Sequence, residues 1–117
     1  MKNEIEWFEE DGVQGGQRGL KVDLVNKKIT KWNGVVEDIS KNNVGDVRWC
    51  IDMNIKSLIE KIDHTTYKLK QTKTEKIKIE GGYRISEPLT ETQKIKYKGK
   101  LDLLTDELDE LFLIDIK

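Results

Sequence analysis

The chain has 117 residues, of which 36% are hydrophobic and 37% charged, and its 21 basic and 22 acidic side chains nearly cancel. This length predicts one domain spanning residues 1–117, and the chain has neither a secretory signal pattern nor an apolar run of about 18 residues for a membrane span. The chain has only one cysteine, Cys50, which excludes an internal disulfide and a Cys-rich zinc site. It has only one histidine, His64, which argues against the usual His-based triads and metal sites. We therefore expect a cytoplasmic protein that is not an enzyme and uses no metal or cofactor.

Alternation of apolar and polar residues predicts three strands in the first third of the chain. Residues 4–9 and 20–24 alternate on either side of a glycine-rich turn, which predicts a hairpin. A turn at Asn26-Lys27-Lys28 leads into a third strand over residues 28–32. Asn33-Gly34, which follows, is typical of a type I′ turn with positive φ at both central residues.

The middle of the chain changes period. After a loop marked by Asn42-Asn43 and Gly45, alternation over residues 47–53 predicts another strand. Apolar residues at helical spacing over 55–62 then predict one short helix, with Asp52 or Asn54 as its N-cap. His64 would lie in a loop just beyond that helix.

The last part of the chain returns to alternation. Short strands are predicted over 67–71, 77–79 and 83–85, with Gly81-Gly82 as a turn, and a long strand over 95–103. Residues 105–110 favour a short helix running into a last strand over 111–116. The predicted fold class is α+β, an antiparallel sheet of about six to seven strands with one or two short helices packed on one face.

Few residues offer catalytic or metal chemistry. His64 is either a lone general base, a pH-sensitive contact or a surface loop histidine, and Cys50 is either a nucleophile or a small buried hydrophobic residue. The acidic residues within 9–11 and 102–110 lack the spacing of calcium ligands, so a solvated surface is the simpler interpretation. The glycines at 12, 15, 16 and 19 precede a strand, which favours a hairpin over a phosphate-binding loop.

Basic residues concentrate in residues 61–100, which contain eleven basic and five acidic side chains. Lysines two residues apart would project from one sheet face if they lay in strands: Lys68 and Lys70, Lys76 and Lys78, and Lys94, Lys96, Lys98 and Lys100. Such a face is a solvated surface, a docking surface for an acidic protein, or a phosphate-binding surface for nucleic acid. Without arginine or aromatic residues on that face, a nucleic-acid surface would lack base readout and stacking.

Three tryptophans are many for a chain of this length. Trp7 and Trp49 are predicted to be core residues. Trp32, just before the Asn33-Gly34 turn, is either a core residue or an exposed interface anchor.

The segment IEWFEEDGVQGGQR, residues 5–18, resembles the opening of the emfourin-type protein inhibitors of thermolysin-like metalloproteases. That family shows a strand, then Gly-Gly-Phe-Ala-Gly, then a polar or basic stretch leading into a second strand. The match covers residues 4–24, and Gly12 and Gly15 fit the family pattern. The departures are Asp11, Val13 and Gln14, which stand where the family has glycine, phenylalanine and alanine. The resemblance implies a small α+β inhibitor that inserts this loop into a protease cleft.

The general profile, small and cysteine-poor, is also similar to that of bacterial immunity proteins and phage-encoded inhibitors. We therefore expect a bacterial or phage, antitoxin-like module for protein–protein interaction: a stoichiometric inhibitor or immunity protein whose charged surface complements an enzyme or toxin. Nucleic-acid binding through the lysine-rich face is the alternative, and the oligomeric state stays open. The predicted contact residues are Gln14, Arg18, Trp32, Lys68, Lys70, Lys76 and Lys78.

Overall fold

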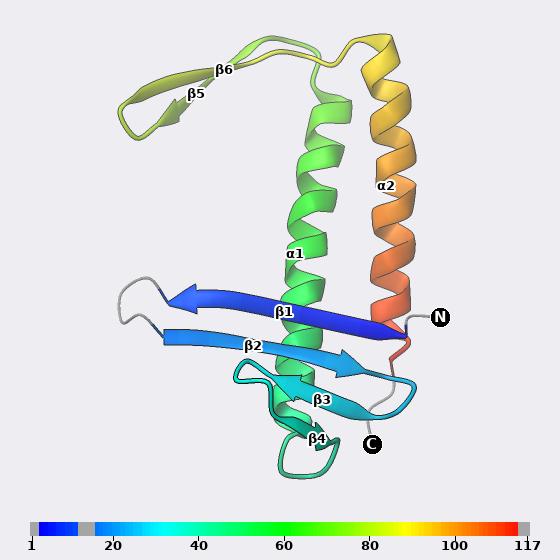
Figure 1. Cartoon of the computed structure of the whole chain (residues 1–117). Helices are drawn as coiled ribbons and strands as arrows, with labels where there is room; N and C mark the ends of the chain where they lie inside the picture. Colours follow the sequence, from blue (N-terminus) through cyan, green and yellow to red (C-terminus); the bar gives the residue numbers. More distant parts are fainter. Residues whose placement is uncertain (1–2, 12–15, 115–117) are drawn as a thin grey trace. The chain divides into compact units, whose positions relative to one another are not determined.

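A computed structural model of the chain describes residues 3–11 and 16–114, which form two antiparallel sheets and two helices (Figure 1). The elements in chain order are β1 (Glu4–Asp11), β2 (Gly16–Asp23), β3 (Lys28–Lys31), β4 (Val36–Asp38), α1 (Val44–Lys70), β5 (Glu75–Ile79), β6 (Gly82–Ser86) and α2 (Glu91–Phe112). The chain divides into a first unit, Met1–Ser57 with Leu108–Lys117, and a second unit, Leu58–Glu107. Whether residues 1–117 act as one domain stays a prediction.

The α+β class is confirmed, but the prediction of one sheet with six to seven strands and short helices is wrong. The strands form a four-stranded sheet in the order β1-β2-β3-β4 and a separate two-stranded ribbon, β5-β6. The helices have 27 and 22 residues. The difference arises because residues 47–53, 67–70 and 95–103, which alternate in sequence, lie in helices.

The four-stranded sheet confirms the predicted first hairpin and third strand. β1 pairs with β2 so that Ile5 lies opposite Val22 and Trp7 opposite Leu20. Residues that face each other in an antiparallel pair project to the same side, so these side chains share one face with Ile29 of β3. Ile5, Leu20, Val22 and Ile29 are all buried. Their face is the one crossed by the first half of α1 (Figure 1).

The first half of α1 replaces the strand predicted over residues 47–53. The buried residues of this segment fall at helical spacing: Val47, Cys50 and Ile51. Asn43, directly before the helix, is buried; its side chain accepts a hydrogen bond from the Ser40 amide (2.8 Å) and donates one to the Asp38 carbonyl (2.7 Å). The helix therefore begins near Asn43, not at Asp52 or Asn54, and Gly45 lies inside it.

The turn after β3 differs in type from the prediction. The Gly34 amide donates to the Lys31 carbonyl and the Lys31 amide donates to the Val35 carbonyl, each at 2.9 Å. Of Asn33 and Gly34, only Gly34 has a positive φ, at 86°. The connection is therefore a three-residue loop ending in a left-handed glycine, because a type I′ turn would need positive φ at Asn33 as well.

In the second unit, the end of α1 is tied to the base of the ribbon. Lys68 Nζ donates to Gln71 Oε1 (2.8 Å), Ser86 Oγ (3.0 Å) and the Glu87 carbonyl (2.6 Å). The buried Gln71 side chain also donates to the Lys73 and Ser86 carbonyls. These bonds replace the strand predicted over residues 67–71, whereas the strands predicted around 77–79 and 83–85 and the Gly81-Gly82 turn are confirmed as β5, β6 and their connection.

Helix α2 replaces the strand predicted over residues 95–103. It starts with a capping box: Thr90 Oγ1 accepts from the Gln93 amide (3.2 Å) and Gln93 Oε1 accepts from the Thr90 amide (2.9 Å). Of the apolar residues that suggested a strand, Ile95 and Leu103 are 72% and 67% exposed, while Tyr97 and Leu101 are half-buried. The helix predicted at 105–110 is the end of this longer helix, and Leu111 and Phe112 belong to it instead of a last strand.

Among the described residues, neither helix combines the length and apolar character that crossing a membrane requires.

Candidate protein-binding site

The first unit exposes an aromatic pair formed by one residue of β1 and one residue of the loop after β3. Phe8 of β1 is 47% exposed and Trp32, in the loop after β3, is 52% exposed. Their ring centroids lie 6.4 Å apart with an interplanar angle of 63°, an edge-to-face contact. Trp32 was predicted to be either a core residue or an exposed residue, and its exposure excludes the first. The two aromatic rings therefore contact each other at the surface, where both are accessible to solvent.

Gly19 positions the Phe8 ring. The two residues face each other across β1 and β2, and a Cβ built on Gly19 would overlap the Phe8 ring. Because glycine leaves that space empty, the ring lies over the β2 backbone, as in the aromatic rescue of a glycine in a sheet. Phe8 was not among the predicted contact residues, since its position over Gly19 depends on the strand register.

A shallow hollow of about 320 Å³ borders Trp32. Its other lining residues come from β2, β3, the following loop and the start of α1: Arg18, Gly19, Leu20, Lys31, Asn33, Asp46 and Trp49. The Arg18 guanidinium lies 3.9 Å from the centre of the Trp49 ring, a cation–π contact. Trp49 was predicted to be a core residue, and it is half-buried beneath this arginine.

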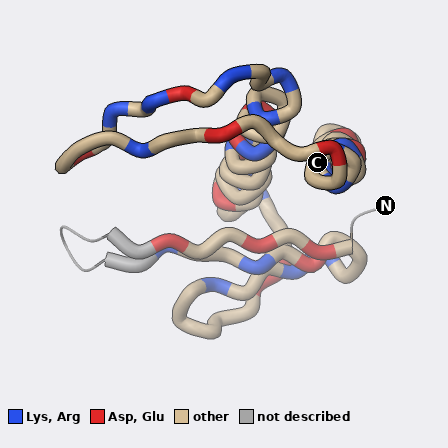
Figure 2. Tube along the Cα trace, turned by 90° about the horizontal axis from the view of Figure 1, so that it is seen from above, with Lys and Arg blue, Asp and Glu red and all other residues tan. Residues whose placement is uncertain are grey.

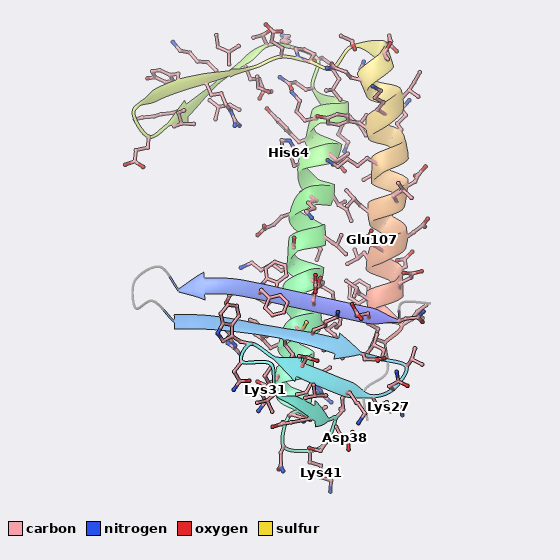
Figure 3. The ribbon with its side chains drawn as sticks, viewed as in Figure 1. Lys27, Lys31, Asp38, Lys41, His64 and Glu107 are labelled. Atoms are coloured by element: carbon pink, nitrogen blue, oxygen red, sulfur yellow. The ribbon has the colours of Figure 1, made fainter. Side chains whose placement is uncertain are left out.

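The charges around the hollow are mixed. Lys31, labelled in Figure 3 at the end of β3, forms a 3.2 Å ion pair with Glu37. Arg18 contributes a second cation, and Asp46, in the first turn of α1, contributes a carboxylate. An aromatic centre with a polar, mixed-charge rim is the usual composition of a protein–protein contact.

The predicted contact residues divide between the two units. Arg18 and Trp32 line the same hollow, as the prediction that both contact one partner requires. Gln14 lies outside the described residues, as does the loop 12–15 that carries the resemblance to emfourin-type inhibitors. The four predicted lysines belong to the second unit.

Those four lysines do not form the predicted sheet face. Lys68 and Lys70 are in α1, and Lys68 is half-buried with its ammonium group engaged in three hydrogen bonds. Lys76 and Lys78 are in β5, where Lys76 Nζ lies 4.4 Å from the centre of the Tyr83 ring. The lysines at 94–100 are in α2, where residues two apart point in widely different directions because each residue turns by about 100°.

The two residues considered for catalysis, Cys50 and His64, both lie in α1, the first in the core and the second at the surface. Cys50 is fully buried, and burial, followed by the nearby Glu6 carboxylate, raises the pKa of its thiol to about 12. Such a thiol stays protonated at neutral pH and packs as a small hydrophobic side chain. His64 is exposed on α1 (Figure 3) instead of lying in a loop beyond the helix.

Within residues 3–11 and 16–114, no group of three or more His, Cys, Asp or Glu side chains is arranged to hold a metal ion. Comparison of the chain with protein-family models, curated proteins and solved structures finds no match. The candidate site therefore rests on its own geometry.

Proposed function

We propose that the chain is a non-catalytic, stoichiometric protein-binding module, an inhibitor or immunity protein that neutralises an enzyme or toxin partner. It contacts that partner through Phe8, Trp32 and Arg18 in the first unit. The observation that carries this proposal is the exposed Phe8–Trp32 pair beside the Arg18–Trp49 contact.

Residue type supports this choice of surface. Tryptophan, tyrosine and arginine dominate the binding energy of protein interfaces, because they offer a large contact area and few flexible torsions or a planar donor group. Burying an exposed aromatic side chain against a partner removes apolar area from water and stabilises the complex. Phe8 and Trp32 are each about half exposed, so both have surface left for such burial.

The proposed setting is the bacterial or phage-infected cytoplasm, where an immunity protein meets its toxin. The nucleic-acid alternative is not developed further, because the lysines on which it depends lie in two helices and a ribbon instead of one sheet face. A gel-shift assay with double-stranded DNA over a range of salt concentrations tests it directly, since phosphate contacts weaken steeply with salt.

The experiment compares three immobilised proteins as baits in host lysate: the wild-type chain, Trp32→Ala and Val25→Ala. Val25 is an exposed apolar residue in the turn between β2 and β3, outside the candidate site, and serves as the matched control. The captured protein is then purified, titrated by calorimetry, and assayed for its own activity with and without the module.

We expect one-to-one binding with loss of the partner's activity, and binding about 30-fold weaker for Trp32→Ala than for Val25→Ala, as for an interface hot spot. Absence of a protein partner at micromolar concentrations contradicts the proposal. Equal binding by the two variants contradicts the placement of the contact.

A further inference from the structure

We propose that the free edge of β1 binds an extended, lysine- or arginine-rich strand of the partner protein, which lengthens the four-stranded sheet by one strand. This inference rests on the proposed function, because it specifies the partner segment that the module would recognise. The argument combines the direction of the β1 backbone groups, the length of the strand and its charge.

The hydrogen-bond register of β1 shows which backbone groups point to the free edge. The Leu24 amide donates to the Asn3 carbonyl at 2.9 Å, so bonded pairs between β1 and β2 recur at every second residue: Ile5 with Val22, Trp7 with Leu20 and Glu9 with Arg18. The amides and carbonyls of Glu4, Glu6 and Phe8 therefore point away from β2. The Glu6 carbonyl fits this direction, because it accepts a 3.0 Å hydrogen bond from the Asn54 side chain of α1 instead of pairing with β2. An incoming strand therefore pairs with the remaining groups of this edge, the amides of Glu4, Glu6 and Phe8 and the carbonyls of Glu4 and Phe8.

No strand of the described part of the chain pairs with this edge, because β1 is the first strand of its sheet and β5 pairs only with β6. β1 has eight residues, whereas the opposite edge strand, β4, has three. Short edge strands resist further pairing, and a long one offers a row of donors and acceptors to another chain. β1 is therefore the edge of this sheet to which an incoming strand adds.

The charge of β1 selects the incoming strand. Five of its eight residues are Glu or Asp and none is basic, and Figure 2 shows acidic positions recurring along its trace. Like charges directly opposite each other destabilise a strand pair, so two copies of β1 repel one another, whereas an incoming strand with lysine or arginine is attracted. Glu4 already forms a 3.3 Å ion pair with Lys21, its diagonal neighbour on β2.

The edge is continuous with the candidate protein-binding site, since Phe8 belongs to both. Its ring lies on the sheet face beside Trp32, while its amide and carbonyl point to the free edge. Strand addition draws its affinity from main-chain hydrogen bonds and its specificity from alternate side chains. A partner strand beside β1 therefore contacts the backbone and the exposed aromatic pair together.

The test uses the full chain and three fluorescently labelled nonapeptides as probes. The first alternates lysine with threonine, and the second has the same sequence with an N-methyl group on every residue, so that it keeps the charge but has no strand donor on either edge. The third replaces lysine by glutamate. Fluorescence anisotropy at low salt gives the dissociation constants.

Two proline variants test separately whether the peptide pairs with β1 or with β4, the two edge strands of the sheet. Glu6→Pro removes an amide that points to the free edge of β1, a position where proline leaves the β1–β2 ladder intact. Val36→Pro is the matched control, because the Lys31–Val35 and Lys27–Ile39 backbone bonds place the Val36 amide on the outer side of β4. Circular dichroism verifies that both variants fold, and amide exchange of Glu4, Glu6 and Phe8 in the wild-type chain supplies a readout that needs no variant.

We expect the lysine peptide to bind about tenfold more tightly than the N-methylated one, the glutamate peptide not to bind, and Glu6→Pro but not Val36→Pro to lose the difference. The amides of Glu4, Glu6 and Phe8 should gain exchange protection when the lysine peptide is present. Equal binding of the lysine and N-methylated peptides, or no binding of either, overturns the inference. Dimerisation of the wild-type chain that Glu6→Pro abolishes overturns it in favour of a second copy.

The captured partner distinguishes this inference from the proposed function. If Trp32→Ala loses that partner while Glu6→Pro binds it like the wild-type chain, the edge inference fails and the proposed function stands. If no partner is captured, the proposed function fails, and the peptide titrations alone decide what the edge binds.

Discussion

The four-stranded sheet and the two-stranded ribbon are built from similar alternating sequences, yet only the sheet has a core. In the sheet, Ile5, Val22 and Ile29 are almost fully buried. In the ribbon, Tyr83 is 61% and Ile85 66% exposed. Alternation therefore identifies a strand, but burial depends on whether an amphipathic helix with a complementary face packs against it. The predictions below test this contrast.

The largest effect is expected from truncating the core of the sheet. Ile29→Ala should lower the free energy of unfolding by about 2–5 kcal/mol, because Ile29 is fully buried and the cavity is only partly refilled. Ile85→Ala in the ribbon should change it by less than about 0.5 kcal/mol. Urea denaturation followed by circular dichroism measures both. Similar losses for the two variants would show that the ribbon also has a packed face.

A smaller effect is expected at Gly19. Gly19→Ala should destabilise the first unit by about 1–3 kcal/mol, because the new methyl group takes the space of the Phe8 ring. Gly45→Ala, in the same unit, is the control: its Cβ meets open space in a helix, so it should stabilise by about 0.5–1 kcal/mol. The Trp fluorescence of Gly19→Ala should also change, since Phe8 contacts Trp32. If both variants change the free energy of unfolding in the same direction, the prediction is contradicted.

In the second unit, the capping box of α2 should contribute less. Thr90→Ala removes the hydroxyl that accepts from the Gln93 amide and should lower the free energy of unfolding by about 1 kcal/mol. Thr90→Ser keeps a hydroxyl at this position and should restore most of the loss. Thermal unfolding at pH 7 compares the three proteins. A Thr90→Ser variant as unstable as Thr90→Ala would show that the methyl group matters and the cap does not.

The smallest effect concerns pH and the turn after β2. The Asn26 amide and side chain, together with the Val25 amide, donate hydrogen bonds to Asp23 and lower the pKa of its carboxyl below the ordinary value of an aspartate. A lowered pKa in the folded state stabilises the fold above the unfolded pKa, and this contribution disappears as pH falls through the folded value.

Asp23→Asn cannot lose a proton, so the difference in melting temperature between wild type and variant should shrink as pH falls from 6 to 2. A difference that is constant over this range would contradict the role of the Asp23 charge.

The parts of the fold that could be predicted are those set by local residues. The first hairpin follows from alternation around Ile5 and Leu20, and the ribbon from Gly81-Gly82, where both glycines have positive φ. The start of α1 was missed because residues 47–53 fit both periods. In a strand over 47–53, Cys50 would lie on the face opposite Val47 and Ile51, but it is fully buried and completes the helical pattern.

Helix α2 shows the same ambiguity. Its apolar residues alternate over 95–103, but two of them, Ile95 and Leu103, face solvent, so hydrophobicity alone gives the wrong period. The Thr90-x-x-Gln93 sequence is the local signal that identifies this helix. Capping residues are therefore more informative than short alternation in a chain this rich in lysine.

In the candidate site, Arg18 and Trp32 were predicted as contact residues from their residue type and their position beside turns, and both line the hollow. Phe8 was not, because its exposure depends on which residue of β2 lies opposite, and register becomes certain only when the strands are paired. The single lysine face was wrong because most of its lysines were assigned to strands but lie in helices: Lys68 and Lys70 in α1 and the lysines of 94–100 in α2, whereas Lys76 and Lys78 do lie in a strand, β5.

The close approach of Phe8 to Gly19 constrains how this protein can diverge. A side chain at position 19 is compatible with the sheet only if position 8 becomes smaller, and glycine at 19 is costly in a strand unless an aromatic ring shields it. A change at either position alone therefore costs stability. Related sequences should therefore change positions 8 and 19 together. Such covariation in an alignment would indicate that β1 pairs with β2 in this register.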